Sequence, residues 1–336
     1  MRAFVIEKPL EASVTEMEKP VPGDDEIVLE VKAVGLCGTD MHIYKGEYFG
    51  TYPRIPGHEF SGVVVETGKK VRNFSVGQRV AADPNIFCES CVECQHNNQN
   101  FCLDFEAVGV SRHGAFAAYT AVPERCVFDT TGLGFTESAL IEPLSCVVFG
   151  HQRIGSRLAE RVLVVGAGPI GLMHTQMAKI NGAASVTVVD LQEEKLELAK
   201  RLGADAVYDS AGFERAALTN HFELVIDCTG IPTVIENSVK YIKNGGTMLL
   251  FGVSPDNSAI TINPYEIFKR QLTLTSSFAL KKTFGLAREL ILQKRVAVLP
   301  LVDSRLPLEE APSFFKKQLE GNRGMKAVFY PNGDAE

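Results

Sequence analysis

The segment Arg161-Val-Leu-Val-Val-Gly-Ala-Gly-Pro-Ile-Gly171 decides how the second half of the chain folds. Its first five residues are typical of a buried strand, and a helical apolar pattern follows from Leu172 to Ile180. The three glycines have Gly-x-Gly-x-x-Gly spacing, which lets a backbone approach a pyrophosphate at a helix N-terminus. Because the motif stands between a strand and a helix, it predicts a dinucleotide-binding β-α-β unit.

The strand expected at residues 185–190 ends in an acid, Asp190, 19 residues after Gly171. Such a carboxylate accepts hydrogen bonds from the adenosine ribose and repels a 2′-phosphate. No arginine follows it directly, so the sequence favours NAD over NADP. Lys195 could reach the ribose, although a solvated lysine on an exposed helix fits equally well. The expected cofactor contacts are Gly166, Gly168, Pro169, Ile170, Gly171, Asp190, Lys195, Thr229, Gly252, Val253 and Ser276.

Strands and helices alternate from residue 161 to residue 276, which predicts a doubly wound parallel sheet in an α/β fold. The cofactor contacts named above follow the expected strands, at the carboxyl ends where such sheets bind ligands. Residues 1–82 and 107–128 instead contain many short β-type runs separated by Gly and Pro. This pattern predicts a β-barrel or sandwich in the first part of the chain.

Four of the eight cysteines lie within 15 residues, at Cys88, Cys91, Cys94 and Cys102. Four thiolates at this spacing can converge on one ion, and a closed four-sulfur site is typical of a structural zinc. An iron–sulfur cluster is the alternative, because its short cysteine runs overlap with this pattern. The segment has few apolar residues of its own, so a metal could replace a core.

A second candidate metal site lies in residues 35–59, which we expect to form loops between the short strands and which contain Cys37, His58 and Glu59. Three ligands with sulfur, nitrogen and oxygen donors fit a catalytic zinc, which keeps one position open. Thr39 and His42 follow the cysteine closely enough to act on a bound substrate. The alternative is a buried cysteine with ordinary loop histidines.

Glu142 is a further candidate ligand. It lies in an apolar helical pattern over residues 137–150, where an unpartnered carboxylate is costly to bury. It therefore either faces solvent or points into the metal site.

The composition excludes several classes of partner. The chain has 336 residues and a formal net charge of −7, which disfavours nucleic acid and anionic membrane surfaces. Neither a secretory signal nor a run of about 18 apolar residues is present, so we expect a cytoplasmic protein that does not bind membranes. Cysteines in the cytoplasm are reduced, so their clustering indicates metal binding rather than disulfides.

These motifs together resemble the zinc-dependent medium-chain dehydrogenase/reductase family, across essentially the whole chain. The segment Gly57-His-Glu-x2-Gly62-x5-Gly68-x2-Val71 is similar to the zinc signature of that family, and the other motifs occur in the family's order. The resemblance implies a GroES-like β-barrel catalytic domain, with the active site in the cleft between it and a Rossmann domain. It implies that the catalytic domain comprises residues 1–148 and 279–336, with a structural zinc lobe at about 84–104. The Rossmann NAD-binding domain would comprise residues 149–278. A homodimer or homotetramer is expected by resemblance alone.

Within the family, the chain looks most like the polyol and L-threonine dehydrogenase branches. Glu142 stands where alcohol dehydrogenases have a second cysteine ligand, so the resemblance implies that Glu59 or Glu142 completes the zinc sphere, with Glu59 ranked slightly higher. His113 and its neighbours depart from the Asp-Gly-Gly-Phe that relatives often carry, which leaves the substrate open.

The expected reaction is oxidation of a secondary alcohol, first a sugar alcohol and second L-threonine, by hydride transfer to NAD. Zinc would lower the pKa of the hydroxyl, and Thr39 and His42 would pass its proton to the surface. The alternatives are a zinc-free quinone or enoyl-type reductase and a non-enzymatic NAD-binding protein.

Overall fold

The computed structural model describes residues 1–47, 51–155, 158–321 and 324–333. These residues form two compact units, each described here by itself. The first comprises Met1–Ser145, Phe284–Lys294 and Val298–Glu336, and the second comprises Cys146–Thr283 and Arg295–Ala297. Helix α4 (Ile141–Ile154) begins in the first unit and ends in the second.

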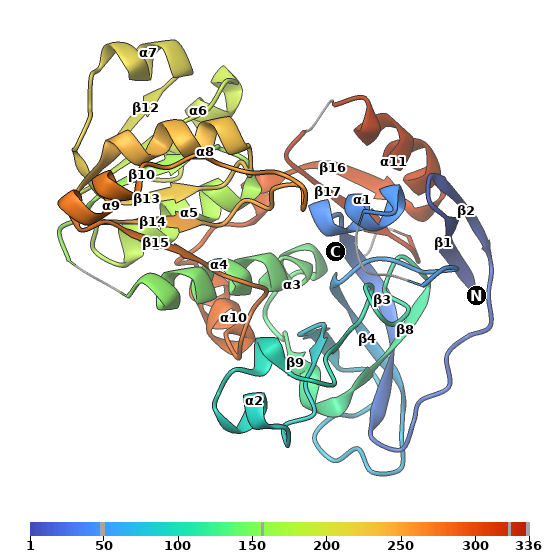
Figure 1. Ribbon diagram of the computed structural model, residues 1–336. Coiled ribbons are helices and arrows are strands. Elements are labelled where there is room, and N and C mark those ends of the chain that lie inside the picture. Colours follow the sequence, from blue (N-terminus) through green and yellow to red (C-terminus); the bar gives the residue numbers. More distant parts are fainter. Residues whose placement is uncertain (48–50, 156–157, 322–323, 334–336) are drawn as a thin grey trace. The chain divides into compact units, whose positions relative to one another are not determined.

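The second unit is built on a six-stranded parallel sheet in the order β12-β11-β10-β13-β14-β15 (Figure 1). The order reverses between β10 and β13, as in dinucleotide-binding sheets, and confirms the expected doubly wound fold. The strands are β10 (Arg161–Val165), β11 (Ser185–Val189), β12 (Ala206–Tyr208), β13 (Phe222–Asp227), β14 (Ile242–Leu250) and β15 (Thr273–Ser276). The helices are α5 (Pro169–Ile180), α6 (Glu193–Arg201), α7 (Ser210–Arg215), α8 (Pro232–Ser238) and α9 (Pro264–Arg270).

Two glycines shape the turn from β10 into α5. Gly166 has a φ of +98°, a conformation that side chains disfavour. A Cβ on Gly171 would lie 1.8 Å from the carbonyl oxygen of Gly166. The turn therefore needs glycine at both positions, and it leaves α5 starting at Pro169 directly after the strand.

The first unit is built on a seven-stranded sheet around β3 (Glu26–Gly35). This strand pairs antiparallel with β4 (Glu59–Thr67), β8 (Tyr119–Pro123) and β17 (Lys326–Tyr330). The sheet is completed by β5 (Arg79–Ala82), β9 (Val127–Asp129) and β16 (Val302–Pro307). Two small sheets pair β1 (Arg2–Lys8) with β2 (Glu11–Glu16) and β6 (Asn85–Ile86) with β7 (Glu106–Ala107). The helices are α1 (Gly38–Lys45), α2 (Val92–Gln95), α3 (Phe135–Ala139), α10 (Phe284–Leu292) and α11 (Ala311–Leu319).

Aromatic rings tie the C-terminal segment into the core of the first unit. Phe315 of α11 lies 4.6 Å from Phe4 and 5.6 Å from Phe116, measured between ring centroids. Phe329 of β17 lies 5.2 Å from Phe116. All four rings are fully buried, so segments some 200 residues apart in sequence share one apolar core.

The structure differs from the sequence-based expectations in three places. Residues 38–45 form a helix where a loop was expected. The helix expected over residues 137–150 is two helices, α3 and α4, which meet at Leu140. Pro143 lies in the first turn of α4, where N–H groups have no helical partner, so a residue without an N–H is tolerated there. The apolar pattern runs across both helices and therefore gave no sign of the break between them. Within residues 107–128, the longest strand is β8 (Tyr119–Pro123), and Ala117 forms only an isolated antiparallel bridge with Ala3. In the part of the chain that the structure describes, no helix has the length and apolar character needed to cross a membrane.

Candidate active site

Cys37, His58 and Glu59 converge in the first unit. Cys37 follows β3, and Glu59 begins β4, where it pairs with Gly35 across the antiparallel ladder. This register brings the three side chains together, with one ligand atom of each lying within 4.8 Å of the other two. Sulfur, nitrogen and oxygen donors at this separation fit a catalytic zinc.

Asp40 holds the loop that carries these ligands. It is fully buried on α1, and its carboxylate accepts from the N–H of Cys37 and from the N–H of Gly57, both at 2.9 Å. Its Oδ1 lies 3.5 Å from Nδ1 of His58, which leaves Nε2 as the nitrogen available to a metal. Burial lowers the pKa of His58, but the charges of Asp40 and Cys37 outweigh it and raise that pKa well above its usual value.

Glu59 is also held by a buried cation. Lys326 of β17 donates to both carboxylate oxygens of Glu59 at 2.8 Å and to the carbonyl of Leu36 at 3.0 Å. Burial lowers the pKa of Lys326, but the negative charges of Glu59 and Cys37 outweigh it and raise that pKa overall. The lysine therefore stays charged and fixes the orientation of Glu59.

Glu142 is buried in the first turn of α4, but it is not a member of the group whose ligand atoms lie within 4.8 Å of one another. Its charge acts on both Lys326 and Asp83. Asp83 is buried directly after β5, and burial together with Glu142 raises its pKa to about 7. The surroundings of the metal group are thus rich in carboxylates.

Thr39 and His42 lie three residues apart on α1, so they share one face of the helix. Thr39 is half-buried and follows Cys37 by two residues. The side chain of His42 is 28% exposed, and its Nδ1 lies 2.9 Å from Oε2 of Glu47. The pair therefore runs from the metal loop toward the surface.

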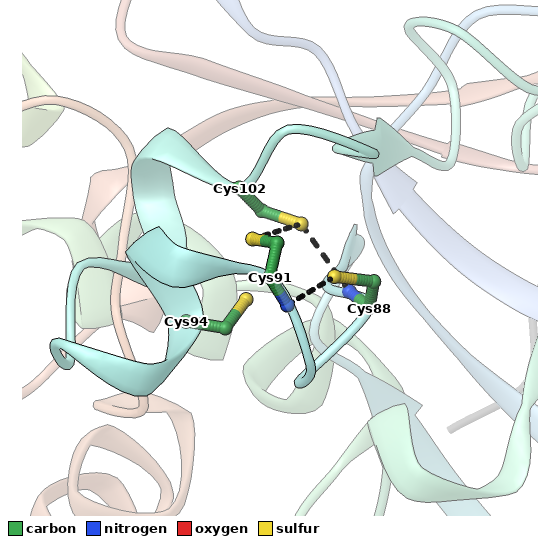
Figure 2. Close-up of side chains that lie close together, drawn as sticks. All are labelled: Cys88, Cys91, Cys94 and Cys102. Carbon is green, nitrogen blue, oxygen red and sulfur yellow. Dashed lines mark hydrogen bonds between the residues drawn. The ribbon is translucent and has the colours of Figure 1, made fainter.

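The four clustered cysteines also converge, and their thiol groups point toward one another (Figure 2). The four sulfurs lie within 4.8 Å of one another, and those of Cys91 and Cys102 are 3.9 Å apart. Backbone N–H donors of Ser90 and Cys91 lower the pKa of Cys88 to about 6, which favours its thiolate. In the described chain, the apolar cluster around them is small and consists of the four cysteines with Phe87 and Phe105. The geometry and chemistry fit a structural zinc.

The sites predicted for the cofactor gather at the carboxyl ends of the strands in the second unit. Asp190 follows β11, and its carboxylate accepts from the N–H of Ala167 at 2.7 Å and from the N–H of Gln192 at 2.9 Å. Thr229 follows β13 and donates its hydroxyl to Asp227 at 2.7 Å. The other predicted contacts lie at the start of α5 (Gly168, Pro169, Ile170, Gly171), on α6 (Lys195), after β14 (Gly252, Val253) and at the end of β15 (Ser276).

Three residues of the site went unnoticed in the sequence. Asp40 had a local signal, because an acid three residues into a helix can accept from the residue before the helix. Asp83 had no such signal, and the only one for Lys326 was its position as a lone lysine in the apolar run 325–330. The roles of both depend on strand pairing between distant segments.

Comparison with known proteins identifies the family. Residues 23–131 match the alcohol dehydrogenase GroES-like domain, and residues 169–293 match the zinc-binding dehydrogenase domain. D-altritol 5-dehydrogenase of Agrobacterium fabrum is 37% identical over 90% of this chain and 91% of its own. D-arabinitol dehydrogenase 1 of Uromyces fabae is 35% identical over 83% of this chain and 82% of its own.

A solved structure from Sinorhizobium meliloti 1021, described as a zinc-binding dehydrogenase bound to NADP, superimposes with a TM-score of 0.93. It is 33% identical and covers 98% of this chain and 99% of its own. The expected GroES-like and Rossmann folds are thereby confirmed, as is a zinc- and NAD(P)-dependent chemistry. The chain belongs to the zinc-dependent medium-chain dehydrogenase family, the zinc-binding alcohol dehydrogenases.

Proposed function

We propose that the protein oxidises a secondary hydroxyl of a polyol to a ketone, with NAD as the hydride acceptor. The observation that carries this proposal is the convergence of Cys37, His58 and Glu59 within one unit of a chain whose other unit has a dinucleotide-binding sheet. The first unit supplies the catalytic site and the second binds the cofactor. A zinc-free reductase or a non-enzymatic NAD-binding protein would not need this ligand set.

Cys37, His58 and Glu59 hold the catalytic zinc, with Glu142 as a further candidate ligand. When bound, zinc polarises the substrate hydroxyl and lowers its pKa. Thr39 accepts the hydroxyl proton, and His42 delivers it to solvent because its side chain is partly exposed and an imidazole can both accept and donate a proton. Cys88, Cys91, Cys94 and Cys102 hold the structural zinc of the lobe.

In the second unit, the glycine turn would hold NAD, which would supply the hydride acceptor. The N–H groups at the start of α5 would hold the pyrophosphate, and Asp190 would accept from the adenosine ribose. The contact with the N–H of Ala167 orients this carboxylate and couples it to the glycine turn. The negative charge disfavours a 2′-phosphate, so we infer NAD rather than NADP.

A polyol suits this site because Glu142 and Asp83 provide buried carboxylates near the metal group, which can accept from vicinal hydroxyls. Relatives named after D-altritol, D-arabinitol and sorbitol agree with this choice. L-Threonine is the second candidate, since a relative 29% identical is an L-threonine 3-dehydrogenase. NAD reduction with a panel of pentitols, hexitols and L-threonine tests both. Activity on L-threonine alone would overturn the polyol proposal.

We also infer a cytoplasmic homo-oligomer that pairs through the edge of the second unit. β15 ends the strand order, so one of its edges has no partner strand in the described chain. Phe268 and Tyr265 on the preceding helix α9 are 80% and 62% exposed. A second copy of the chain would cover them. Light scattering of the wild type and of Phe268→Asp measures the mass, and a monomeric wild type would contradict this inference.

A further inference from the structure

Arg54 is a buried cation without a carboxylate partner. Among the lysines and arginines that the structure describes, only Arg54 and Lys326 are buried, each 6% exposed. Lys326 is neutralised by Glu59, but no carboxylate of the described chain lies within 4.0 Å of the Arg54 guanidinium. A buried charge without a counter-charge is unfavourable, so this side chain needs a partner that the described residues do not supply.

The Arg54 side chain is held in place, but most of its N–H donors form no hydrogen bond within the described chain. Its backbone forms two hydrogen bonds with Ile6, at 2.8 and 2.9 Å, which anchor the residue against β1. Its Nη2 donates to the hydroxyl of Thr51 at 2.6 Å, while its Nε is enclosed and has no hydrogen-bond partner among the residues that the structure describes. A guanidinium has five N–H donors arranged in a fork, so most of them remain available to an acceptor.

His113 provides a second donor beside it. The N–H of Ile55 donates to Nδ1 of His113 at 3.2 Å, so in the neutral ring the proton is on Nε2. The ring is exposed, which leaves that N–H free to bind a group arriving from solvent. Burial lowers the pKa of His113, and the positive charge of Arg54 lowers it further. The second effect is expected where the two groups are neighbours and no anion lies between them.

We propose that Arg54 and His113 form a binding site for a small oxyanion, either a phosphate or a carboxylate. The guanidinium can donate to two oxygens of such a group, and the Nε2–H of His113 can donate a third hydrogen bond. Arg54 precedes His58 by four residues, and the carbonyl of Ile55 accepts from the N–H of Gly114 at 2.7 Å. The site therefore adjoins the loop of the metal group but uses none of its ligands.

This oxyanion could be free phosphate or an anionic group of the substrate. Thermal unfolding of the zinc-loaded protein with saturating NAD tests the site without relying on activity. The bound NAD keeps phosphate away from the glycine turn. Phosphate at ten times its dissociation constant should raise Tm by about 2–4 °C over sodium chloride of equal ionic strength.

Three variants decide whether this effect belongs to Arg54 and His113. His113→Asp places a carboxylate beside the guanidinium, so Tm in chloride should rise and the phosphate increment should vanish. Arg54→Met should also remove the increment, whereas the neutral control His113→Asn, which keeps an N–H donor and places no charge beside the guanidinium, should retain most of it. If Arg54→Met does not fold, His113→Asp still carries the test. An increment that is absent in the wild type, or that survives in His113→Asp, would overturn the proposal.

Inhibition kinetics then identify the source of the anion once an alcohol substrate is known. If phosphate raises KM and leaves kcat unchanged, the site receives an anionic group of the substrate. If phosphate stabilises the protein without changing KM, the site is a separate one for a free anion. Both results support the site, and inactivity on every alcohol would leave the thermal test unaffected.

Discussion

Lys326 contacts both carboxylate oxygens of Glu59 at 2.8 Å, and both side chains are buried. Removing one partner of such a pair leaves the other charge uncompensated, at a cost of roughly 3–5 kcal/mol. The pairing also fixes the carboxylate that we assign to the catalytic zinc. Lys326 is thus a positioning residue for a proposed metal ligand.

Replacement of Lys326 should weaken the metal site. Lys326→Met should lower zinc affinity or kcat/KM by about 10- to 100-fold, as loss of groups that orient metal ligands usually does. Lys326→Arg retains the positive charge and should recover most of the loss. Competition with a chelator measures the zinc affinity, and equal affinity in Lys326→Met and wild type would refute the role.

The resting ligand can be identified by metal content. Glu59→Gln should reduce the zinc content from about two ions per chain to about one, because Glu59 belongs to the converging group and neutral amides bind zinc poorly. Glu142→Gln should keep both ions and lose activity instead. Elemental analysis after dialysis distinguishes the two, and the reverse result would assign Glu142 as the ligand.

Loss of the structural zinc should affect stability rather than chemistry. Cys94→Ser should lower Tm and remove one zinc ion, because the lobe has little apolar core to replace the metal. Cys126→Ser is the matched control, since this buried cysteine lies outside both metal groups and should leave two ions bound. NAD binding should persist in both variants, because the second unit is intact.

Asp190 should set the cofactor preference. Asp190→Asn keeps the shape and an acceptor for Ala167 but removes the negative charge. Charged hydrogen bonds contribute about 1.5–3 kcal/mol, so KM for NAD should rise about 10- to 100-fold while KM for NADP falls. Steady-state kinetics with both cofactors measure the ratio. An unchanged preference would mean that other groups discriminate.

Two buried histidines of the second unit should make the protein sensitive to mild acid. His151 accepts from Asn181 through Nδ1, at 3.0 Å, and its Nε2 lies 3.1 Å from Nδ1 of His174. Burial lowers the pKa of His151 to about 4 and that of His174 well below its usual value. Unfolded histidines titrate near 6.5, so below that pH the unfolded state binds more protons.

The stability contributed by these neutral rings is therefore complete above about pH 6.5 and falls as the pH drops toward about 4. Each ring should contribute a slope of about 1.4 kcal/mol per pH unit in that window. Urea unfolding between pH 5 and 7 measures it. His151→Leu combined with His174→Leu should flatten the slope, whereas His96→Gln on the exposed lobe should not.

Most of the fold could be predicted from local sequence patterns. The glycine turn, the acid at Asp190 and the cysteine spacing act over short stretches, so their structural context could be predicted from neighbouring residues. Helix α1 was missed because its stability comes from the Cys37–Asp40 cap and from Gly46 in a left-handed conformation, not from an apolar pattern. Lys326 was missed because its partner is set by the pairing of β17 with β3, which no local pattern encodes.

The ion pair of Glu59 and Lys326 also has a consequence for the newly made protein. Lys326 lies 267 residues after Glu59, and the entire dinucleotide-binding unit is synthesised between them. At about 5–20 residues per second, a ribosome needs roughly 13–50 s to cover that distance. During this interval Cys37, His58 and Glu59 can already attract metal, but the lysine that orients the carboxylate does not yet exist. A zinc ion bound in this interval would occupy a site whose carboxylate is not yet held in place, and the site is complete only after β17 has joined the sheet.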